Sequence, residues 1–343
     1  MFRFLIVLAS CVFSLHPAAA QQDSLRGRYV EEFPDKFFIW PVIKQRELSF
    51  DIQNRYDGSQ KLSYKPNNSY SIGLGVYLFE VAFEFSAAIP LDERSRNTYG
   101  ASEIRDLQAN FLGKYWGVDL YRQNYSGFYV VNRNQGPASP DPFIKRSDIK
   151  VINTGTNFIY AFNRSKYSLK AAFNYSEKQL KSAGSFIIAG SVNTARLQAD
   201  SSVVGQIYSP DQYSVSSFRK FQYAAFGLAP GYAHSLIYRS FFFNGAFSVG
   251  PAHYWINYSA QDKVDYDMSI NTYVDIRLAL GYNSNRVFGG VSYIIQSRNI
   301  RFENIEFTNN SSTLKFLVGY RFQEKGVLKK RAKDYIPVNK PAR

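Results

Sequence analysis

The chain has 343 residues, of which 45% are hydrophobic, 17% aromatic and 20% charged, and 41 basic against 27 acidic side chains give a net charge of +14. Beyond the N-terminal region, no apolar run approaches the ~18 to 20 residues that a membrane-spanning helix needs, and the aromatic content excludes a disordered chain. The length allows two ordinary domains or one large all-β unit.

The N-terminus predicts a secretory signal peptide. Met1–Arg3 is a short basic segment, Phe4–Leu15 is apolar, and Ala18–Ala20 supplies the small residues of a cleavage site. We therefore expect residues 1–20 to be removed. An alternative is a lipoprotein acylated at Cys11, although that would leave an apolar core shorter than such signals need. Under the main interpretation the mature chain has no cysteine and no disulfide.

Between residues 48 and 323, apolar and polar side chains alternate in repeated segments of roughly 8 to 13 residues, which is the pattern of half-buried strands. About thirteen such segments can be counted, and 183–193 is the weakest. A barrel with both ends of the chain on one side needs an even number. We expect twelve strands, with fourteen as the alternative. The last segment is the clearest, with Leu314, Phe316, Val318, Tyr320 and Phe322 on one face and Lys315, Gly319, Arg321 and Gln323 on the other.

Repeated alternation fits either a soluble sandwich or a transmembrane barrel. The segment lengths suit tilted membrane strands, aromatic residues gather at the segment ends, and short connections mix with long polar ones. These features predict an all-β fold, a transmembrane antiparallel β-barrel in the bacterial outer membrane. A soluble secreted β protein is an alternative.

The expected organisation has four parts. Residues 1–20 are the signal peptide, 21–47 a periplasmic lead-in, 48–323 the barrel and 324–343 a basic periplasmic tail. Within the barrel, the alternation over 167–175 predicts a strand that follows a short turn.

The polar faces of the segments predict a lumen that carries charges of both signs, which either pair into a plug or line a narrow pore. Trp116, Tyr254 and Trp255 are expected at the membrane interfaces, where amphipathic rings are stable. The predicted lumen residues are Asp51, Arg55, Glu84, Lys114, Lys170, Asp265, Asp267, Asp275, Arg277 and Arg321.

Catalytic and metal chemistry has little support in the sequence. No metal-ligand spacing occurs, and we expect neither a metal nor a cofactor. His253 is a catalytic candidate, because it lies beside Tyr254 and Trp255 at an expected membrane boundary. It would serve a lipid-modifying acyl hydrolase or transferase, but no motif singles out a nucleophile.

The expected partners are outer-membrane lipid, lipopolysaccharide and the outer-membrane assembly machinery, whereas nucleic acid is excluded by the signal peptide and the membrane-type alternation. The oligomeric state stays open. The candidate loop cations for lipopolysaccharide are Arg94, Arg96, Arg133, Lys145, Arg146, Arg298 and Arg301.

Four stretches resemble an uncharacterised family of Bacteroidota outer-membrane β-barrels, domain-of-unknown-function family 4421. They are Tyr64–Asn67 leading into Gly73 and Gly75, the run Glu177–Ser185, Pro230–Tyr232 and Gly319–Phe322. The resemblance covers about residues 30–325 and implies an outer-membrane barrel without an assigned activity. We therefore expect a narrow pore, a ligand-accepting barrel or an envelope accessory.

Overall fold

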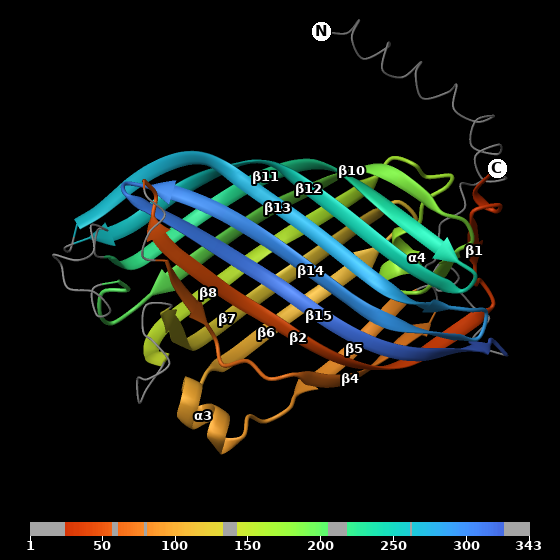
Figure 1. Ribbon diagram of the computed structural model, residues 1–343, viewed down its shortest axis with the longest axis horizontal. Coiled ribbons are helices and arrows are strands. Elements are labelled where there is room, and N and C mark those ends of the chain that lie inside the picture. The colour runs from red at the N-terminus through yellow and green to blue at the C-terminus, as the bar shows by residue number, and fades with distance from the viewer. Residues whose placement is uncertain are drawn as a thin grey trace, which may run out of the picture.

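The computed structural model describes residues 25–56, 61–78, 81–132, 143–204, 218–260 and 263–325. Within these ranges, long antiparallel strands form a tilted barrel, and two short helices accompany it (Figure 1). The elements are β1 (Val30–Glu32), β2 (Lys36–Asn54), β3 (Leu62–Lys65), β4 (Ser71–Leu78), β5 (Val81–Ala88), α3 (Glu93–Tyr99), β6 (Glu103–Leu112), β7 (Trp116–Asn132), β8 (Phe143–Ala161), α4 (Leu169–Phe173), β9 (Glu177–Gln179), β10 (Ala183–Gln198), β11 (Phe218–Tyr238), β12 (Phe241–Ala260), β13 (Lys263–Asn283), β14 (Val287–Phe302) and β15 (Ile305–Gln323).

The barrel closes through ten strands in the order β15-β14-β13-β12-β11-β10-β8-β7-β3-β2, and β2 pairs with β15 to complete the ring. The predicted antiparallel barrel is confirmed, but the predicted count of twelve strands, with fourteen as the alternative, was wrong. The count was too high because β4, β5 and β6 alternate like wall strands although they do not belong to the closed ring. The weakest predicted segment, 183–193, is a genuine strand, β10.

The two ends of the wall differ because β3 and β4 lie one after the other along the same edge of β2. β3 pairs with β2 on one side and β7 on the other, which closes the ring at one end. Towards the other end β4 pairs with β2, β5 pairs with β4, and β6 pairs with the first part of β7. No ladder joins β5 to β6 among the described residues.

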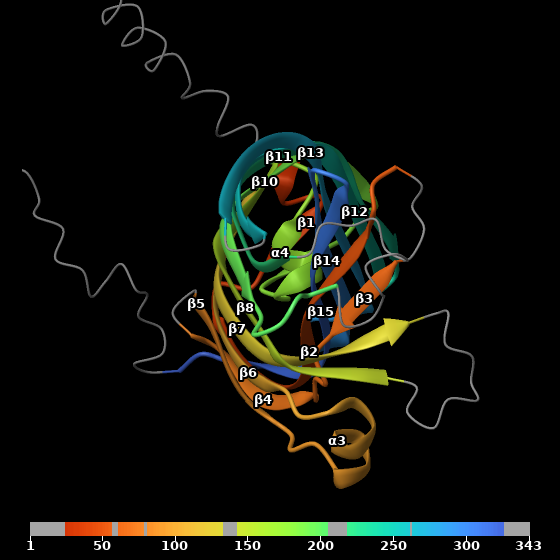
Figure 2. The same cartoon turned by 90° about the vertical axis from the view of Figure 1, so that its left-hand side faces the viewer.

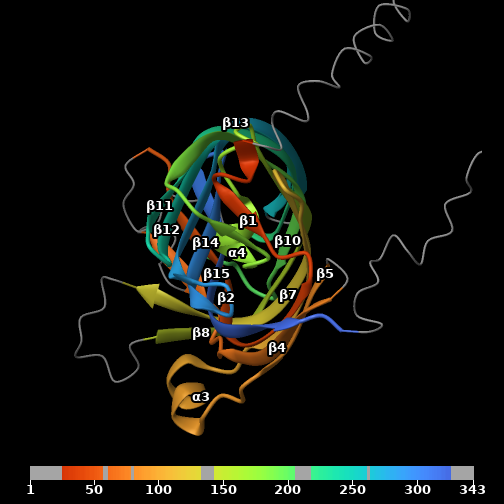
Figure 3. The ribbon, with the colours of Figure 1, turned by 90° about the vertical axis from the view of Figure 1, so that its right-hand side faces the viewer.

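The end of β15 and the start of β2 mark one end of the barrel, which we call the terminal end (Figure 3). The hairpin turns β11–β12 and β13–β14 lie there and are short. The opposite end, which we call the outer end, carries the connections β7–β8 and β10–β11 and faces the viewer in Figure 2.

The outer surface of the barrel is apolar, as the alternation predicted for most strands. Phe186, Met268 and Ile270 expose 73%, 68% and 69% of their surface. The face predicted for the last strand, with Phe316 and Val318, is also exposed. Such a continuous apolar exterior is unusual for a water-soluble protein. In the described part of the chain, no helix has the length and apolarity to cross a membrane.

The lumen is filled in layers. At the outer end a buried cluster extends across the whole interior and includes Leu48, Phe50 and Ile52 of β2. Alternation shows that a strand has one apolar face, but it does not show whether that face points into the lumen or outward. In this part of β2 the apolar face points into the lumen. A second cluster, with Phe38 and Phe288, fills the terminal end.

A plug made of α4, β9 and β1 occupies the terminal end of the lumen (Figure 3). The predicted strand over 167–175 was wrong, because this segment forms α4 inside the barrel. Ser168 caps the helix by accepting a hydrogen bond from the backbone N–H of Ala171 at 3.1 Å. β9 then pairs with β1, which brings the start of the described chain into the plug.

The wall begins at Lys36, so the second half of the predicted lead-in, 21–47, belongs to β2. Proline removes a ladder donor, so Pro41 is unfavourable inside a paired strand. Pro41 lies at a break in the ladder between β2 and β15, because no residue of β2 between Ile39 and Val42 pairs with β15. The predicted signal peptide and almost all of the predicted tail lie outside the described residues.

Candidate functional site

A cavity of about 510 Å³ lies in the lumen between the two apolar clusters. Its floor is apolar and is formed by Trp40, Tyr77 and Phe288, with Phe173 of the plug helix. Its upper part is polar and includes Arg277. A cavity of this size falls in the range that binds small ligands, which is ~300 to 1,000 Å³. The mixed lining suits a molecule with an apolar part and a polar part.

The cavity continues through the wall between β5 and β6. Five consecutive residues of each strand line it, Val81–Phe85 and Gln108–Leu112. Successive side chains of a strand point to opposite faces, so the cavity passes along the strand edges from the lumen to the exterior. Phe85 and Phe111, which lie on the outer side of this opening, expose 74% and 48% of their surface. We call this opening the wall gap.

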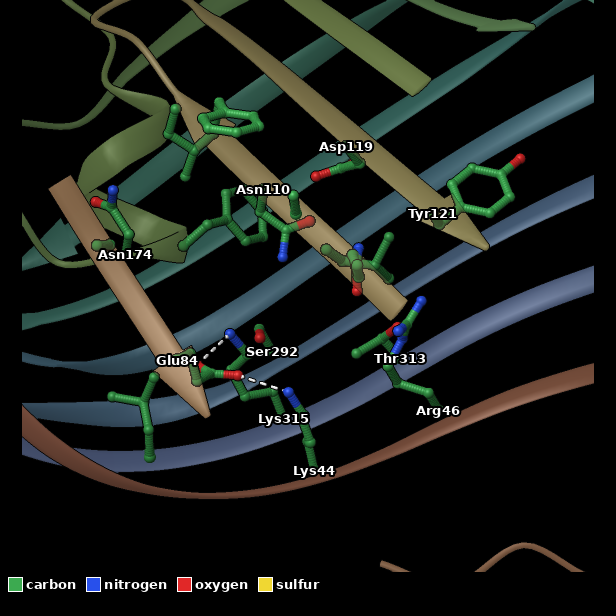
Figure 4. A pocket seen from close by; sticks show the side chains of 18 of the residues that line it. Lys44, Arg46, Glu84, Asn110, Asp119, Tyr121, Asn174, Ser292, Thr313 and Lys315 are labelled. Carbon is green, nitrogen blue, oxygen red and sulfur yellow. Dashed lines mark hydrogen bonds and ion pairs between the residues drawn. The ribbon is translucent and has the colours of Figure 1, made fainter. Parts of the chain in front are cut away.

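Glu84 of β5 points into the cavity towards two lysines of the nearby strands β2 and β15, which lie beyond β4 on the same side of the wall gap (Figure 4). Lys44 of β2 donates to its Oε1 at 3.0 Å, and Lys315 of β15 donates to its Oε2 at 3.0 Å. The indole Nε1 of Trp40 lies 3.4 Å from the same Oε2. One carboxylate therefore satisfies three donors from β2 and β15.

A second ionic contact holds β6. Arg46, which follows Lys44 on the inner face of β2, donates to Oδ1 of Asp106 at 2.5 Å. Tyr125 donates to the other carboxylate oxygen of Asp106 at 3.0 Å. The strands on both sides of the wall gap are thus tied to the same stretch of β2, one through Glu84 and one through Asp106.

A polar layer separates the cavity from the outer cluster. Arg277 donates to Oδ1 of Asp275 at 2.8 Å and lies 3.5 Å from Oδ2 of Asp119. Gln296 donates to Asp275 at 2.8 Å and accepts from Asn157 at 2.8 Å. Buried charges need such partners, because leaving one unpaired costs several kcal/mol. The layer is therefore a closed network rather than a channel lining.

Arg298 is buried next to this layer without a carboxylate partner among the described residues. Its Nη2 donates to Ser191 at 2.6 Å and Asn157 at 3.0 Å, and its guanidinium lies 5.3 Å from the ring of Tyr273. Its Nε and Nη1 have no partner. Hydrogen bonds and the face of the Tyr273 ring therefore stabilise the guanidinium of Arg298, a role that a carboxylate often has elsewhere.

The outer end of the lumen is closed by aromatic packing. Phe50 stacks on Tyr64 with ring centroids 4.5 Å apart, and it contacts Phe128 and Phe307 at 5.5 and 5.4 Å. Each of these side chains is almost fully buried. No open channel follows from such a core, because protein interiors of this kind leave few voids larger than a water molecule.

The plug is held by a buried ion pair. Arg26 donates to Oε2 of Glu177 at 2.6 Å and to the carbonyl oxygen of Arg164 at 2.5 Å. Ser168 donates to the same carboxylate. Burial raises the pKa of Glu177 above its ordinary value, and the neighbouring Arg26 opposes this shift. Since both side chains are buried, the pair fixes β1 against β9.

Five of the predicted lumen residues lie inside the barrel. Glu84, Asp275 and Arg277 belong to the cavity and the polar layer described above. Arg321 is buried at the terminal end, where its guanidinium lies 4.1 Å from the ring of Phe33. Lys170 also lies inside, but on the plug helix α4 rather than on a wall strand.

The other five predicted lumen residues lie at the rims, so their assignment to the lumen was wrong. Asp51 is on the outer face of β2, because Phe50 and Ile52 take the inner face. Arg55 follows the end of β2 and is exposed. The remaining three are Lys114, in the turn before β7, and Asp265 and Asp267, on the part of β13 that extends beyond its pairing with β14.

Two of the three predicted interfacial aromatics are exposed on the outer surface. Trp116 and Trp255 expose 42% and 49% of their surface. Tyr254 points into the lumen and is fully buried, so its assignment to an interface was wrong. It lies one residue from Trp255 along a strand and therefore faces the opposite way.

His253 lies on the outer surface of β12, between Phe226 and Ile270 of the neighbouring strands. Its ring packs against Trp255 at 4.3 Å, and its Nδ1 has no hydrogen-bond partner. A catalytic histidine needs a nucleophile and an orienting acid, and among the described residues neither forms a hydrogen bond with His253 Nδ1. Across the described ranges, no group of three His, Cys, Asp or Glu side chains could hold a metal ion.

The two lysine partners of Glu84 were not among the residues that the sequence predicted for the lumen. Lys315 stands on the polar face of the last predicted strand, so the alternation already placed it inside the barrel. Lys44 lies in the predicted lead-in, 21–47. No pattern in the sequence indicates that it contacts Glu84. Arg146 and Arg298, expected as loop cations, are buried, each with 1% of its surface exposed.

The fold and the cavity define a closed antiparallel β-barrel with an apolar exterior and a plugged lumen. The chain belongs to the family described as domain of unknown function (DUF4421), which it matches over residues 21–322. This confirms domain-of-unknown-function family 4421 as the family, whereas the Bacteroidota origin stays a prediction.

Comparison with curated proteins gives no match. Among solved structures, the chain is similar to the outer-membrane protease OmpT of Escherichia coli, with 10% identity, a TM-score of 0.38, and 85% of this chain and 98% of that chain covered. The attachment invasion locus protein Ail of Yersinia pestis has 9% identity and a TM-score of 0.24, with 85% and 99% covered. The translocator domain of the autotransporter NalP of Neisseria meningitidis has 6% identity and a TM-score of 0.29, with 93% and 99% covered. No functional residue is transferred from these proteins.

Proposed function

We propose that the protein is an outer-membrane β-barrel that accepts an amphiphilic ligand from the membrane through the wall gap. The apolar exterior supports the membrane location, as does the signal peptide that the sequence predicts. The chemistry of the barrel exterior makes outer-membrane lipid its surrounding partner.

The observation that carries the proposal is the continuity of the cavity with the exterior between β5 and β6. Unpaired backbone groups of a strand edge are costly in hydrocarbon, so two free edges at membrane depth require a polar or occupied space between them. The cavity supplies that space. Its apolar floor accommodates the chain of an amphiphile, while the lysines and the polar layer accommodate its head.

A pore is the weaker candidate. Conduction needs a continuous polar path, whereas the outer cluster around Phe50 and the plug at the terminal end both interrupt the lumen. We expect the protein to be silent in single-channel recordings in planar bilayers. Regular unitary conductance would favour the pore instead.

The direct experiment is lipid mass spectrometry of the protein purified from membranes. Ser292 lines the cavity on the inner face of β14, and Val291 beside it faces outward. Ser292→Trp should fill the cavity and remove the co-purified amphiphile. Val291→Trp places the same side chain on the outer surface and should retain it. Equal retention in both variants, with both barrels folded by heat-modifiable migration, would contradict the proposal.

A further inference from the structure

We propose that Lys44 and Lys315 bind the anionic head group of the ligand, and that Glu84 takes the place of this head group in the present structure. The inference rests on the proposed function, because it assigns a chemical class to the ligand of the same cavity. The ligand would be an amphiphile with a carboxylate or a phosphate head.

The first argument is geometric. The Nζ atoms of Lys44 and Lys315 each lie 3.0 Å from an oxygen of Glu84, and Trp40 adds a third donor at 3.4 Å. Donors that converge on one carboxylate form a site for an oxyanion, because charge-assisted hydrogen bonds are shorter and stronger than neutral ones. An incoming carboxylate or phosphate would meet the same three donors, of which Figure 4 shows the two lysines.

The second argument is the local charge. Lys44 and Lys315 are direct partners in the ladder between β2 and β15. Like charges at directly opposite positions destabilise a sheet, and a single carboxylate leaves this pair with one excess positive charge. The lysine side chains are about one-fifth exposed, at 20% and 21%, and both line the cavity. The position is thus partly desolvated yet accessible from the cavity, which strengthens the attraction of an anion.

The third argument is the position of Glu84 on a free strand. β5 pairs with β4 only, and its other edge faces the wall gap in the described part of the barrel. Glu84 holds β5 to β2 and β15 through the two lysines. A head group that replaces its carboxylate leaves the lysines satisfied and frees the Glu84 side chain, so that the backbone ladder with β4 then holds β5 without this side-chain contact. Binding of the head group therefore loosens the strand that forms one side of the wall gap.

The test uses tryptophan fluorescence. The chain has 3 tryptophans, and Trp116→Phe with Trp255→Phe leaves Trp40, which is 4% exposed and contacts Glu84. The protein in uncharged detergent is titrated at mildly alkaline pH with a dibrominated fatty acid and with its methyl ester, whose bromines quench only nearby indoles. The fatty acid should bind about tenfold more tightly than the ester, as expected for hydrogen bonds to a charged group.

Three variants in this background separate binding from folding. Lys44→Gln with Lys315→Gln should remove the preference for the acid, and Glu84→Gln should increase the affinity for the acid because it removes a competing anion. A purely structural Glu84 would give the opposite result, a weaker site in Glu84→Gln. Lys220→Gln, on the exposed surface of β11, is the matched control and should behave like the parent.

The remaining outcomes distinguish the two proposals. Equal binding of acid and ester, unchanged in the lysine variant, would overturn the head-group assignment and leave the amphiphile cavity standing. No quenching of Trp40 by either compound would overturn both. Competition by inorganic phosphate as strong as by the fatty acid would assign the lysine pair to a small soluble anion and overturn the amphiphile.

Discussion

The ion pair of the plug provides the sharpest prediction about stability. Arg26 and Glu177 have side-chain exposures of 7% and 3%, and their contact is 2.6 Å long. Glu177→Ala removes the nearer acid and leaves the buried guanidinium with two carbonyl oxygens and with the partly exposed Glu32, whose Oε1 lies 3.6 Å from its Nε. Glu177→Gln keeps an acceptor of nearly the same shape but removes the charge.

The magnitude follows from what each change leaves behind. Breaking a buried pair by removing one partner costs roughly 3–5 kcal/mol, because the other charge stays buried. The loss of charge alone in Glu177→Gln retains a hydrogen bond and should cost about 1–2 kcal/mol. The double variant Arg26→Met with Glu177→Leu has no unpaired charge at this position. It should therefore recover most of the stability that Glu177→Ala loses. The order of stability is therefore parent, double variant or glutamine variant, and last the alanine variant.

Hydrogen exchange measured by mass spectrometry can compare the stability of the plug among these variants. The β1–β9 ladder consists of three residue pairs, Val30–Glu32 with Glu177–Gln179, and its amides report the opening of the plug. A cost of about 3–5 kcal/mol corresponds to exchange roughly 10²- to 10⁴-fold faster in Glu177→Ala, up to the limit of complete opening. The amides of β12 and β13 serve as the internal control and should stay protected. Exchange in Glu177→Ala as slow as in Glu177→Gln would refute the reasoning, because it would mean that the buried guanidinium of Arg26 needs no hydrogen-bond acceptor at position 177.

The other predictions concern the wall and the lumen, and urea unfolding of the refolded barrel measures each of them. Arg277→Met leaves two buried acids unpaired and should cost roughly 3–5 kcal/mol, whereas Arg298→Met removes a cation without an acid and should change stability by less than about 1.5 kcal/mol. Phe50→Ala should cost about 3–5 kcal/mol as a buried ring is lost, and Phe85→Ala, at an exposed ring, should cost less than about 0.5 kcal/mol. Val192→Lys places a charge on the outer surface and should cost up to about 2–4 kcal/mol in a bilayer. No change there would support a water-facing exterior.

The exterior of the barrel was predictable from the sequence, whereas the contents of its lumen were only partly so. In β15 the two faces differ in polarity, so Phe316 and Lys315 could be assigned to the exterior and the interior. In β2 the alternation has the same period, but Phe50 belongs to a packed core at the outer end. Periodicity cannot distinguish an apolar face that contacts lipid from one that fills a plugged lumen, because both exclude water.

The plug and the site show the second limit of the sequence. Over five residues, Leu169 to Phe173, a strand and a short helix produce similar patterns, and the capping by Ser168 is a weak local signal. The site depends on contacts between positions far apart in the chain. Glu84 and Lys315 are 231 residues apart, and only the register of the closed sheet brings them together. Each polar face could be recognised by itself, but their pairing could not.

The small size of β3 has a consequence for how the barrel opens. β3 makes three residue pairs with β2 and four with β7, yet these short ladders alone complete the ring. The wall gap lies next to these ladders, towards the terminal end. The unpaired edge of β5 and the β3–β7 ladder therefore form one continuous line of weak strand pairing along the barrel, which we call the seam. Detachment of β3 from β7 would convert the cylinder into a curved open sheet without disturbing the long ladders of β10 to β15. An amphiphile longer than the cavity could then leave sideways along this seam while the rest of the wall stays intact.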